Sequence, residues 1–289
     1  MKENISLERM PHQASFNLYY LWQYRSKSAI CDGIKMNLER ILDIFMSYWP
    51  MFLRGAWATL YISIIGTVIG TVIGLLIGVI RTIPVPERGI KKIVLKIVNI
   101  ILSAYIAIFR GTPMIVQAVL IFYGSAEALN INMNKTIAAI FIVSINTGAY
   151  MSEIVRGGII SIDKGQFEAA QAIGMNHIKT MRYIVLPQVI RNILPATGNE
   201  FVINIKDTSV LNVISVTELF FMSKSVVSNT FRYYDTFFIT CIIYFVMTYS
   251  ITKLLRFAEK KLDGPDNYIL LGNQMQVEKP EDKAKRAGR

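Results

Sequence analysis

The sequence is poor in charged residues and in cysteine. Only 18% of its 289 residues are charged, whereas about a quarter are charged in soluble globular proteins. Its two cysteines and two histidines are too few for a disulfide framework or a zinc site. No GxxxxGK[ST] loop that could hold the phosphates of ATP occurs. These deficits argue against a soluble enzyme, a disulfide-linked domain and an ATPase, and we predict no metal ion, cofactor or catalytic residue in this chain.

Apolar residues are abundant and lie in long runs. They make up 53% of the chain, and the mean hydropathy is +0.40. The formal net charge is +11, but no basic stretch is interleaved with aromatic residues as in nucleic-acid-binding proteins. Lysines and arginines instead flank the apolar runs, where they would meet the surface of a bilayer. The composition therefore predicts an all-α membrane protein without a nucleic-acid partner.

Five transmembrane helices are predicted from these runs. The first is free of charge and, as a helix, would be about 36 Å long. Within it Gly66, Gly70, Gly74 and Gly78 form a ridge against which another helix can pack. In the second, Arg110 is followed by Gly-Thr-Pro, which interrupts a helix, so this span should be broken. Polar residues of the fourth must face the bundle interior or a water-filled cavity. The spans cover residues 57–80, 97–123, 136–155, 184–205 and 237–255.

The distribution of lysine and arginine predicts the orientation of these helices. Cytoplasmic loops of membrane proteins carry an excess of basic residues, and the two most basic loops, at 81–96 and 156–182, follow the first and third spans. We therefore expect both loops and a basic tail at 261–289 in the cytoplasm, with the N-terminus outside. The remaining parts are an extracytoplasmic segment at 1–50 and a transmembrane domain at 51–260.

The loop at residues 163–182 has a pattern too regular for a passive linker. Residues 168–172 are good helix formers, Gly174 allows a sharp bend, and a second helix is expected to begin near His177. A helix, a bend and a helix that project from a membrane domain can dock into a cleft of a soluble partner. A helix hairpin that lies on the membrane surface is the alternative.

The same residues carry a resemblance to a known family. Glu168, Ala169 and Ala170, followed by Gly174 and by Leu186-Pro187, resemble the EAA loop of permease subunits in binding-protein-dependent ABC importers. The surrounding residues look like the polar amino-acid branch of that family. They include FRGTPMIVQ at 109–117, NTGAYMSEIVRGG at 146–158 and LPQVIRNILPATGNEF at 186–201.

The resemblance implies the transmembrane domain of a type I ABC importer, with about five membrane helices and cytoplasmic coupling helices. Such a subunit pairs with a second permease subunit, identical or homologous, in the bacterial inner membrane. It sits on two ATP-binding subunits and receives an amino acid from an extracytoplasmic binding protein. ATP and Mg²⁺ would be used by the ATPase partner, so this chain would be a transport subunit and not an enzyme.

Five residues are assigned to ATPase coupling by this resemblance. They are Glu168, Ala169, Ala170, Gly174 and His177. We expect Glu168 to cap or steady the first coupling helix and Gly174 to form the bend. His177 has no cysteine or carboxylate at ligand spacing, which favours a surface contact over a metal ligand or a catalyst.

Polar residues within the spans are candidates for the translocation path: Arg110, Asn146, Thr147, Tyr150, Glu153, Lys206 and Asp207. Each of them has a structural alternative. Arg110 can pair with carbonyl groups freed by the helix break, and Glu153 can form a local ion pair with Arg156. Lys206 and Asp207 can neutralise each other. The three neutral residues can hydrogen-bond neighbouring helices.

These observations favour ATP-driven uptake of an amino acid by alternating access. The main alternative is a secondary transporter driven by an ion gradient, in which the charged residues of the spans would couple ions to substrate. The lack of a detectable internal repeat in the five spans argues against that alternative.

Overall fold

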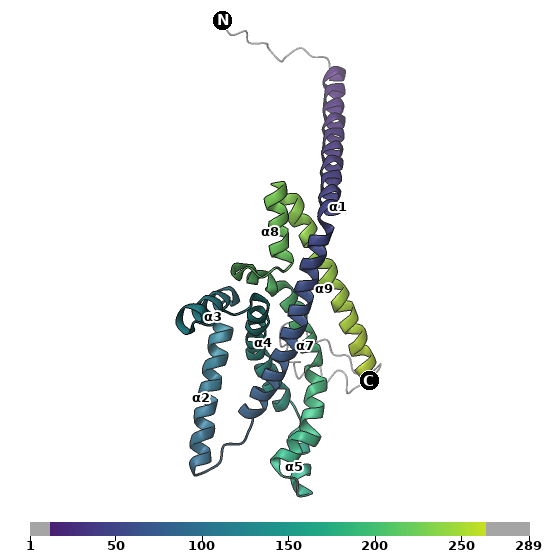
Figure 1. Cartoon of the computed structure of the whole chain (residues 1–289). Coiled ribbons are helices and arrows are strands. Elements are labelled where there is room, and N and C mark those ends of the chain that lie inside the picture. Colours follow the sequence, from purple (N-terminus) through teal and green to yellow (C-terminus); the bar gives the residue numbers. More distant parts are fainter. Residues whose placement is uncertain (1–11, 264–289) are drawn as a thin grey trace, which may run out of the picture.

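All regular elements in the described part of the chain are helices. The computed structural model describes residues 12–263, with side chains from residue 38 onward, and most of the predicted basic tail lies outside these residues. Four helices are long and apolar enough to cross a membrane, and a fifth span results if a bent helix pair is counted as one. Figure 1 shows them as a bundle from which one end of α1 projects. The predicted all-α membrane fold is confirmed.

Helix α1 spans His12–Arg81 and extends well before the first predicted span. Residues 1–11 of the predicted N-terminal segment lie outside the described residues. The boundary placed between residues 50 and 51 falls inside α1, which runs through Pro50. A proline within a helix removes one N–H donor and bends the axis, and α1 changes direction where it joins the bundle (Figure 1). Its membrane-compatible part is Leu38–Arg81.

The second predicted span is two separate helices. Helix α2, Ile90–Gly111, is long enough to cross a bilayer alone, whereas α3, Met114–Leu129, is shorter. The chain breaks at Thr112 and Pro113, where the sequence predicts an interruption. Figure 1 shows α3 lying across the end of α2. The second span therefore covers residues 90–111, not 97–123, because Pro113 ends the helical hydrogen bonding there.

Helix α4, Lys135–Ile160, contains the third predicted span and is the most buried candidate span. It packs along α1 on the predicted glycine ridge. A Cβ atom added at Gly70 would lie 2.6 Å from the Cβ of Thr147, and one added at Gly78 would lie 2.6 Å from Cγ1 of Val155. The missing side chains let the two backbones approach closely and gain dispersion contacts. The ridge therefore has the packing role that its spacing predicts.

The fourth span is continuous with the coupling loop. Helix α5, Lys164–Ala172, is followed by a bend and by α6, His177–Thr180. A π-helical turn, η1 at Met181–Val185, joins α6 to α7, Leu186–Asp207. Pro187 follows the π-helical turn directly within this continuous helix and removes one N–H donor from it. One helical rod thus leads from the coupling loop into the membrane.

The remaining elements close the far end of the bundle. A 3₁₀ segment, η2 at Thr208–Ile214, follows α7. The next helix is α8, Leu219–Thr230, and its axis is bent by 55° from that of the segment His177–Ile214. Helix α9, Tyr233–Asp263, contains the fifth predicted span. Helices α1, α8 and α9 share an apolar core built around Phe52, Leu219, Val226 and Ile239.

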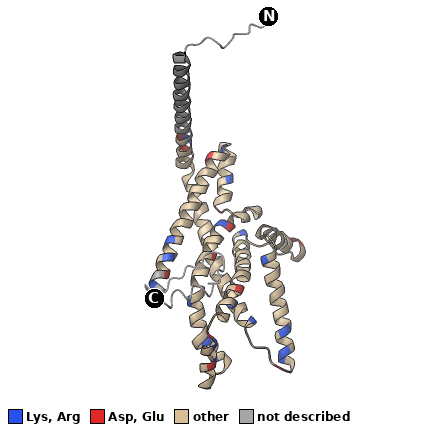
Figure 2. Ribbon diagram, turned by 180° about the vertical axis from the view of Figure 1, so that it is seen from behind, with Lys and Arg blue, Asp and Glu red and all other residues tan. Residues whose placement is uncertain are grey.

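The two ends of the bundle differ in charge. The end of α1, the start of α2 and the segment α5–α6 lie at one end, whereas α8 and η2 lie towards the other (Figure 1). Figure 2 shows lysine and arginine near the tips of α2 and α9 at the first end. Both basic loops therefore lie at the same end, which we call the basic end.

Candidate functional site

The coupling loop forms a protrusion, residues 163–180, at the basic end (Figure 1). Asp163 caps α5, because its Oδ1 accepts a hydrogen bond of 2.7 Å from the N–H of Gly165. Asn176 caps α6 in the same way, accepting a bond of 2.9 Å from the N–H of Lys179. Glu168 lies in the middle of α5 and is exposed. The expected capping role of Glu168 is therefore wrong, and Asp163 performs it.

Gly174 forms the bend between the two helices, as predicted. Its φ of +76° is in the left-handed region, which only glycine adopts without strain. The N–H of Met175 donates to the carbonyl of Ala170 at 3.0 Å, and the N–H of Gly174 donates to the carbonyl of Gln171 at 2.9 Å. These two bonds form a Schellman motif, which satisfies the last carbonyls of α5.

The base of the protrusion is packed firmly against the bundle. Ala170 is 1% exposed. Phe167 packs against a buried cluster that includes Val155 of α4, Met181 of η1 and Val189 of α7. The protrusion is thereby joined to two membrane helices by side-chain packing, so it can move with them as one body.

The tip of the protrusion is apolar and uncovered. Ile173 is 76% exposed and Ile178 is 74% exposed, while Ala169 is also exposed and His177 is half-buried. Figure 1 shows the protrusion pointing away from the bundle rather than lying flat beside it. Two large apolar side chains at such a tip suit burial in a cleft of a partner protein. This arrangement favours the docking interpretation over a hairpin on the membrane surface.

A second polar region is formed by residues of α2, α4 and α7, and we call it the polar face: Arg110, Tyr150, Glu200 and Asp207. The guanidinium carbon of Arg110 lies 5.4 Å from the centre of the Tyr150 ring, a cation–π contact. Glu200 interacts electrostatically with both Arg110 and Asp207. The path prediction did not include Glu200, although its spacing of seven residues from Asp207 places both on one side of α7.

Arg110 does not satisfy the carbonyl groups freed by the helix break. Gln117 does so, because its Nε2 donates to the carbonyl of Phe109 at 3.0 Å and to that of Thr112 at 2.9 Å. Asn146 supports it by donating to the Gln117 Oε1 at 3.0 Å and to the Phe109 carbonyl at 3.3 Å. The prediction that Arg110 pairs with the freed carbonyls is therefore wrong. The prediction that Asn146 hydrogen-bonds neighbouring helices is confirmed.

Thr147 also joins helices rather than lining an open path. It is 1% exposed. The amide Nδ2 of Asn204 donates to the Thr147 hydroxyl at 2.9 Å and to the Thr67 hydroxyl at 2.8 Å. One buried asparagine of α7 thus links α1 and α4, which are already packed on the glycine ridge.

The two predicted charge pairs have different outcomes. Glu153 pairs with Arg156, whose Nη2 lies 2.9 Å from Oε2, and its other oxygen pairs with Arg81 of α1. Within the described residues Lys206 and Asp207 form no ion pair, and both are exposed. The charge of Lys206 still interacts electrostatically with Asp207. The local Glu153 pair is confirmed. Lys206 and Asp207 interact as charges without forming an ion pair, so their mutual neutralisation stays a prediction.

Comparison with known proteins identifies the family of this chain. The model of the family described as "Binding-protein-dependent transport system inner membrane component" matches residues 94–263. The chain is 36% identical over 214 residues to the glutamine transport system permease protein GlnP of Escherichia coli strain K12, covering 74% of this chain and 93% of that protein. It is 38% identical over 173 residues to the nopaline transport system permease protein NocM of Agrobacterium fabrum, covering 57% and 72%.

Solved structures agree with this result. A crystal structure of an amino acid ABC transporter with histidines contains a chain that is 36% identical, with a TM-score of 0.65, and the match covers 75% of this chain and 96% of that one. A methionine ABC transporter in an inward-facing conformation is 19% identical with a TM-score of 0.55, and it supports the fold alone. The matched family region contains both the protrusion and the polar face. The chain therefore belongs to the family of inner membrane components of binding-protein-dependent transport systems and has the type I ABC importer fold.

Proposed function

We propose that this permease subunit imports a polar amino acid, driven by ATP hydrolysis in separate subunits that hold the protrusion. The shape and packing of the protrusion carry this proposal. Its tip exposes Ile173 and Ile178, its bend is set by Gly174, and its base is packed against α4 and α7. When the ATPase subunits close, the tip moves with them and its packed base transmits the movement to the membrane helices.

The continuous rod from α6 to α7 supports the route of this movement. It runs from His177 next to the bend to Asp207 at the polar face. A rigid-body rotation of the rod therefore displaces Glu200 and Asp207 relative to Arg110. That displacement would open and close access to the polar face from the two sides of the membrane.

The chemistry of the polar face supports an amino acid as the substrate. The named relatives include transport systems for glutamine, nopaline and arginine, and such compounds carry a carboxylate and an ammonium or guanidinium group. Arg110 can bind the carboxylate, and Glu200 and Asp207 can bind a cationic group. The ring of Tyr150 offers a surface for further contact with the ligand.

The same arrangement supports our proposal for the partners and the orientation. We place the basic end in the cytoplasm, in agreement with the excess of lysine and arginine in its loops. Two ATP-binding subunits, which use ATP and Mg²⁺, would hold the protrusions of this chain and of a second permease subunit. An extracytoplasmic binding protein would deliver the amino acid at the opposite end of the bundle.

Uptake by the whole transporter in vesicles tests the proposed energy source. Radiolabelled amino acid and binding protein are supplied on one side of the membrane and ATP on the other, and all ion gradients are collapsed with ionophores. We expect uptake to continue with ATP and to stop with a non-hydrolysable analogue. Uptake that survives without ATP hydrolysis but requires an ion gradient would refute the proposal and support the secondary transporter.

A further inference from the structure

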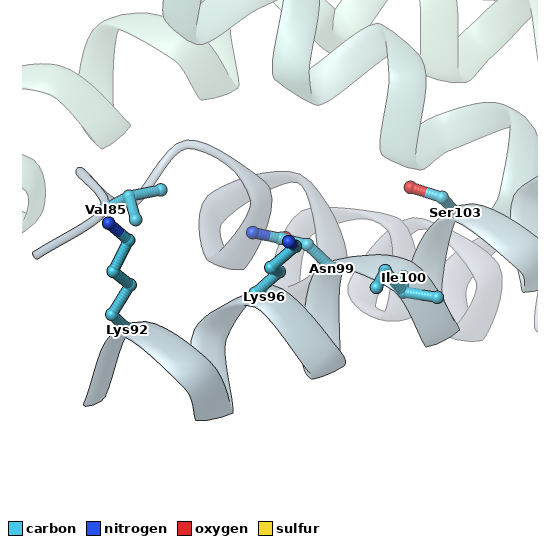
Figure 3. Close-up of a pocket in the computed structure, with 6 residues that line it drawn as sticks. All are labelled: Val85, Lys92, Lys96, Asn99, Ile100 and Ser103. Carbon is cyan, nitrogen blue, oxygen red and sulfur yellow. The ribbon is translucent and has the colours of Figure 1, made fainter. Parts of the chain in front are cut away.

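A groove of about 550 Å³ lies at the basic end, between α2 and the loop that follows α1 (Figure 3). Its size is within the range of sites that hold small molecules. Five of its lining residues come from α2 and one from the loop: Val85, Lys92, Lys96, Asn99, Ile100 and Ser103. The polar residues of this groove belong to neither the protrusion nor the polar face.

The polar lining residues share one side of α2. Lys92, Lys96, Asn99 and Ser103 follow one another at intervals of four, three and four residues, which places them on one helical face. Figure 3 shows the Lys92 side chain reaching towards the loop that carries Val85 and the Lys96 ammonium beside the Asn99 amide. The groove thus has a cationic part near the helix start and a neutral polar part deeper along the helix.

The charges of this groove are not compensated by the protein. Two lysines four residues apart on a helix repel each other, and within the described residues neither forms an ion pair with a carboxylate. The Lys92 ammonium bonds to the carbonyl of Glu87 at 3.3 Å. The side-chain oxygen of Asn99 is buried without a hydrogen-bond partner. A ligand that carries an anionic group would compensate both exposed ammonium groups.

The surroundings of the groove distinguish a lipid from a free anion. Only 6% of the α2 membrane window is buried, so this helix is almost uncovered. Beside and beyond the lysines, Ile93, Ile97 and Ile101 are more than half exposed. Acyl chains can cover these side chains, whereas a free phosphate ion cannot. Lysines placed where a membrane helix leaves the hydrocarbon are suited to bind lipid headgroups.

We propose that the groove binds the headgroup of an anionic glycerophospholipid. The phosphate lies between the ammonium groups of Lys92 and Lys96, and the acyl chains run along the isoleucines of α2. The lipid thereby joins α2 to the loop after α1. This site is independent of the amino acid that the permease carries and of its energy source.

Native mass spectrometry of the delipidated whole transporter tests this site. The complex is titrated separately with phosphatidylglycerol, phosphatidylcholine and inorganic phosphate. We expect a tightly bound phosphatidylglycerol for each copy of this chain and no comparable binding of phosphatidylcholine. The double variant Lys92→Ala and Lys96→Ala should weaken this binding by roughly 30-fold, because both charges that face the phosphate are removed.

A matched control separates the groove from general surface charge. Lys91 lies on the same helix and is exposed, but it does not line the groove. The Lys91→Ala variant should retain the tight phosphatidylglycerol. Equal loss in Lys91→Ala and in the double variant, unchanged binding in the double variant, or displacement of the lipid by millimolar phosphate would overturn the proposal. A melting temperature measured for each complex confirms that the variants are folded.

Discussion

At the scale of single residues, Gly174 shows how one backbone angle shapes the protrusion. Its φ is +76°, and an added Cβ would meet no atom within 4 Å. A side chain at this position is therefore limited by backbone strain and not by space. For a residue other than glycine, the left-handed conformation costs about 1–2 kcal/mol. Asparagine tolerates this conformation better than a β-branched residue does.

Replacing Gly174 separates strain from side-chain volume. In Gly174→Val the strain should reduce the population of the native bend by roughly tenfold. More ATP should then be hydrolysed for each amino acid imported. In Gly174→Asn the ATP hydrolysed for each amino acid imported should stay close to that of the unchanged protein, because asparagine can adopt the bend. The ratio of phosphate released to amino acid taken up in vesicles measures the effect. Equal ratios in the two variants would show that the bend does not couple the two processes.

Residue roles that depend on neighbours in the sequence could be predicted, whereas roles that depend on another helix could not. The Gly174 bend and the Glu153–Arg156 pair depend on neighbours in the sequence, and both are present. The cap of α5 is Asp163 and not Glu168, because a capping residue precedes the first turn, whereas Glu168 lies in the middle of the helix. Glu200 was not recognised as part of the polar face, since its partner Arg110 comes from another helix.

At the scale of elements, the glycine ridge decides how α1 and α4 pack. Every fourth residue of α1 is a glycine over this stretch, and each lies against the backbone or side chain of α4. Side chains at these positions would clash with α4. Their absence lets the two helices pack closely in lipid, which stabilises the pair. The buried bonds from Asn204 to Thr67 and Thr147 join α7 to the same pair.

A valine on this ridge should destabilise the bundle. In Gly70→Val the new Cβ would lie 2.6 Å from the Thr147 Cβ, so the helices must separate, which costs about 1–3 kcal/mol. The midpoint of thermal unfolding of the purified complex, followed by tryptophan fluorescence, should fall. Gly124→Val is the control, because an added Cβ at Gly124 meets nothing within 4 Å. Identical midpoints for the two variants would contradict the packing role of the ridge.

At the scale of the whole molecule, the bundle separates its two tasks in space. The protrusion with its apolar tip lies at the basic end, and the polar face is formed by separate residues of α2, α4 and α7. The α6–α7 rod connects them. Attachment of the ATPase subunits should therefore depend on the tip and not on the opposite end of the molecule.

Co-purification of the ATPase subunits tests this dependence. Ile173→Asp and Ile178→Asp each place a charge where an apolar contact is expected, and each should lose about 1.5–3 kcal/mol of apolar burial. This corresponds to a roughly 10- to 100-fold weaker complex. The control is Ile131→Asp, in the loop between α3 and α4, where Ile131 is 52% exposed. This variant should co-purify the ATPase as the unchanged chain does. Retention of the ATPase by both tip variants would refute docking through these side chains.

The sequence by itself determined the membrane helices, the interruption at Pro113, the glycine ridge and the helix–bend–helix of the coupling loop. Each depends on hydropathy, helical spacing or backbone freedom, which are properties of neighbouring residues. Only the tertiary structure decided which polar side chains share the polar face and which hold helices together. Thr147 and Tyr150 are three residues apart on α4, yet one bonds to Asn204 and the other faces Arg110. Those roles are set by which sides of separate helices meet, and packing of the whole bundle determines that.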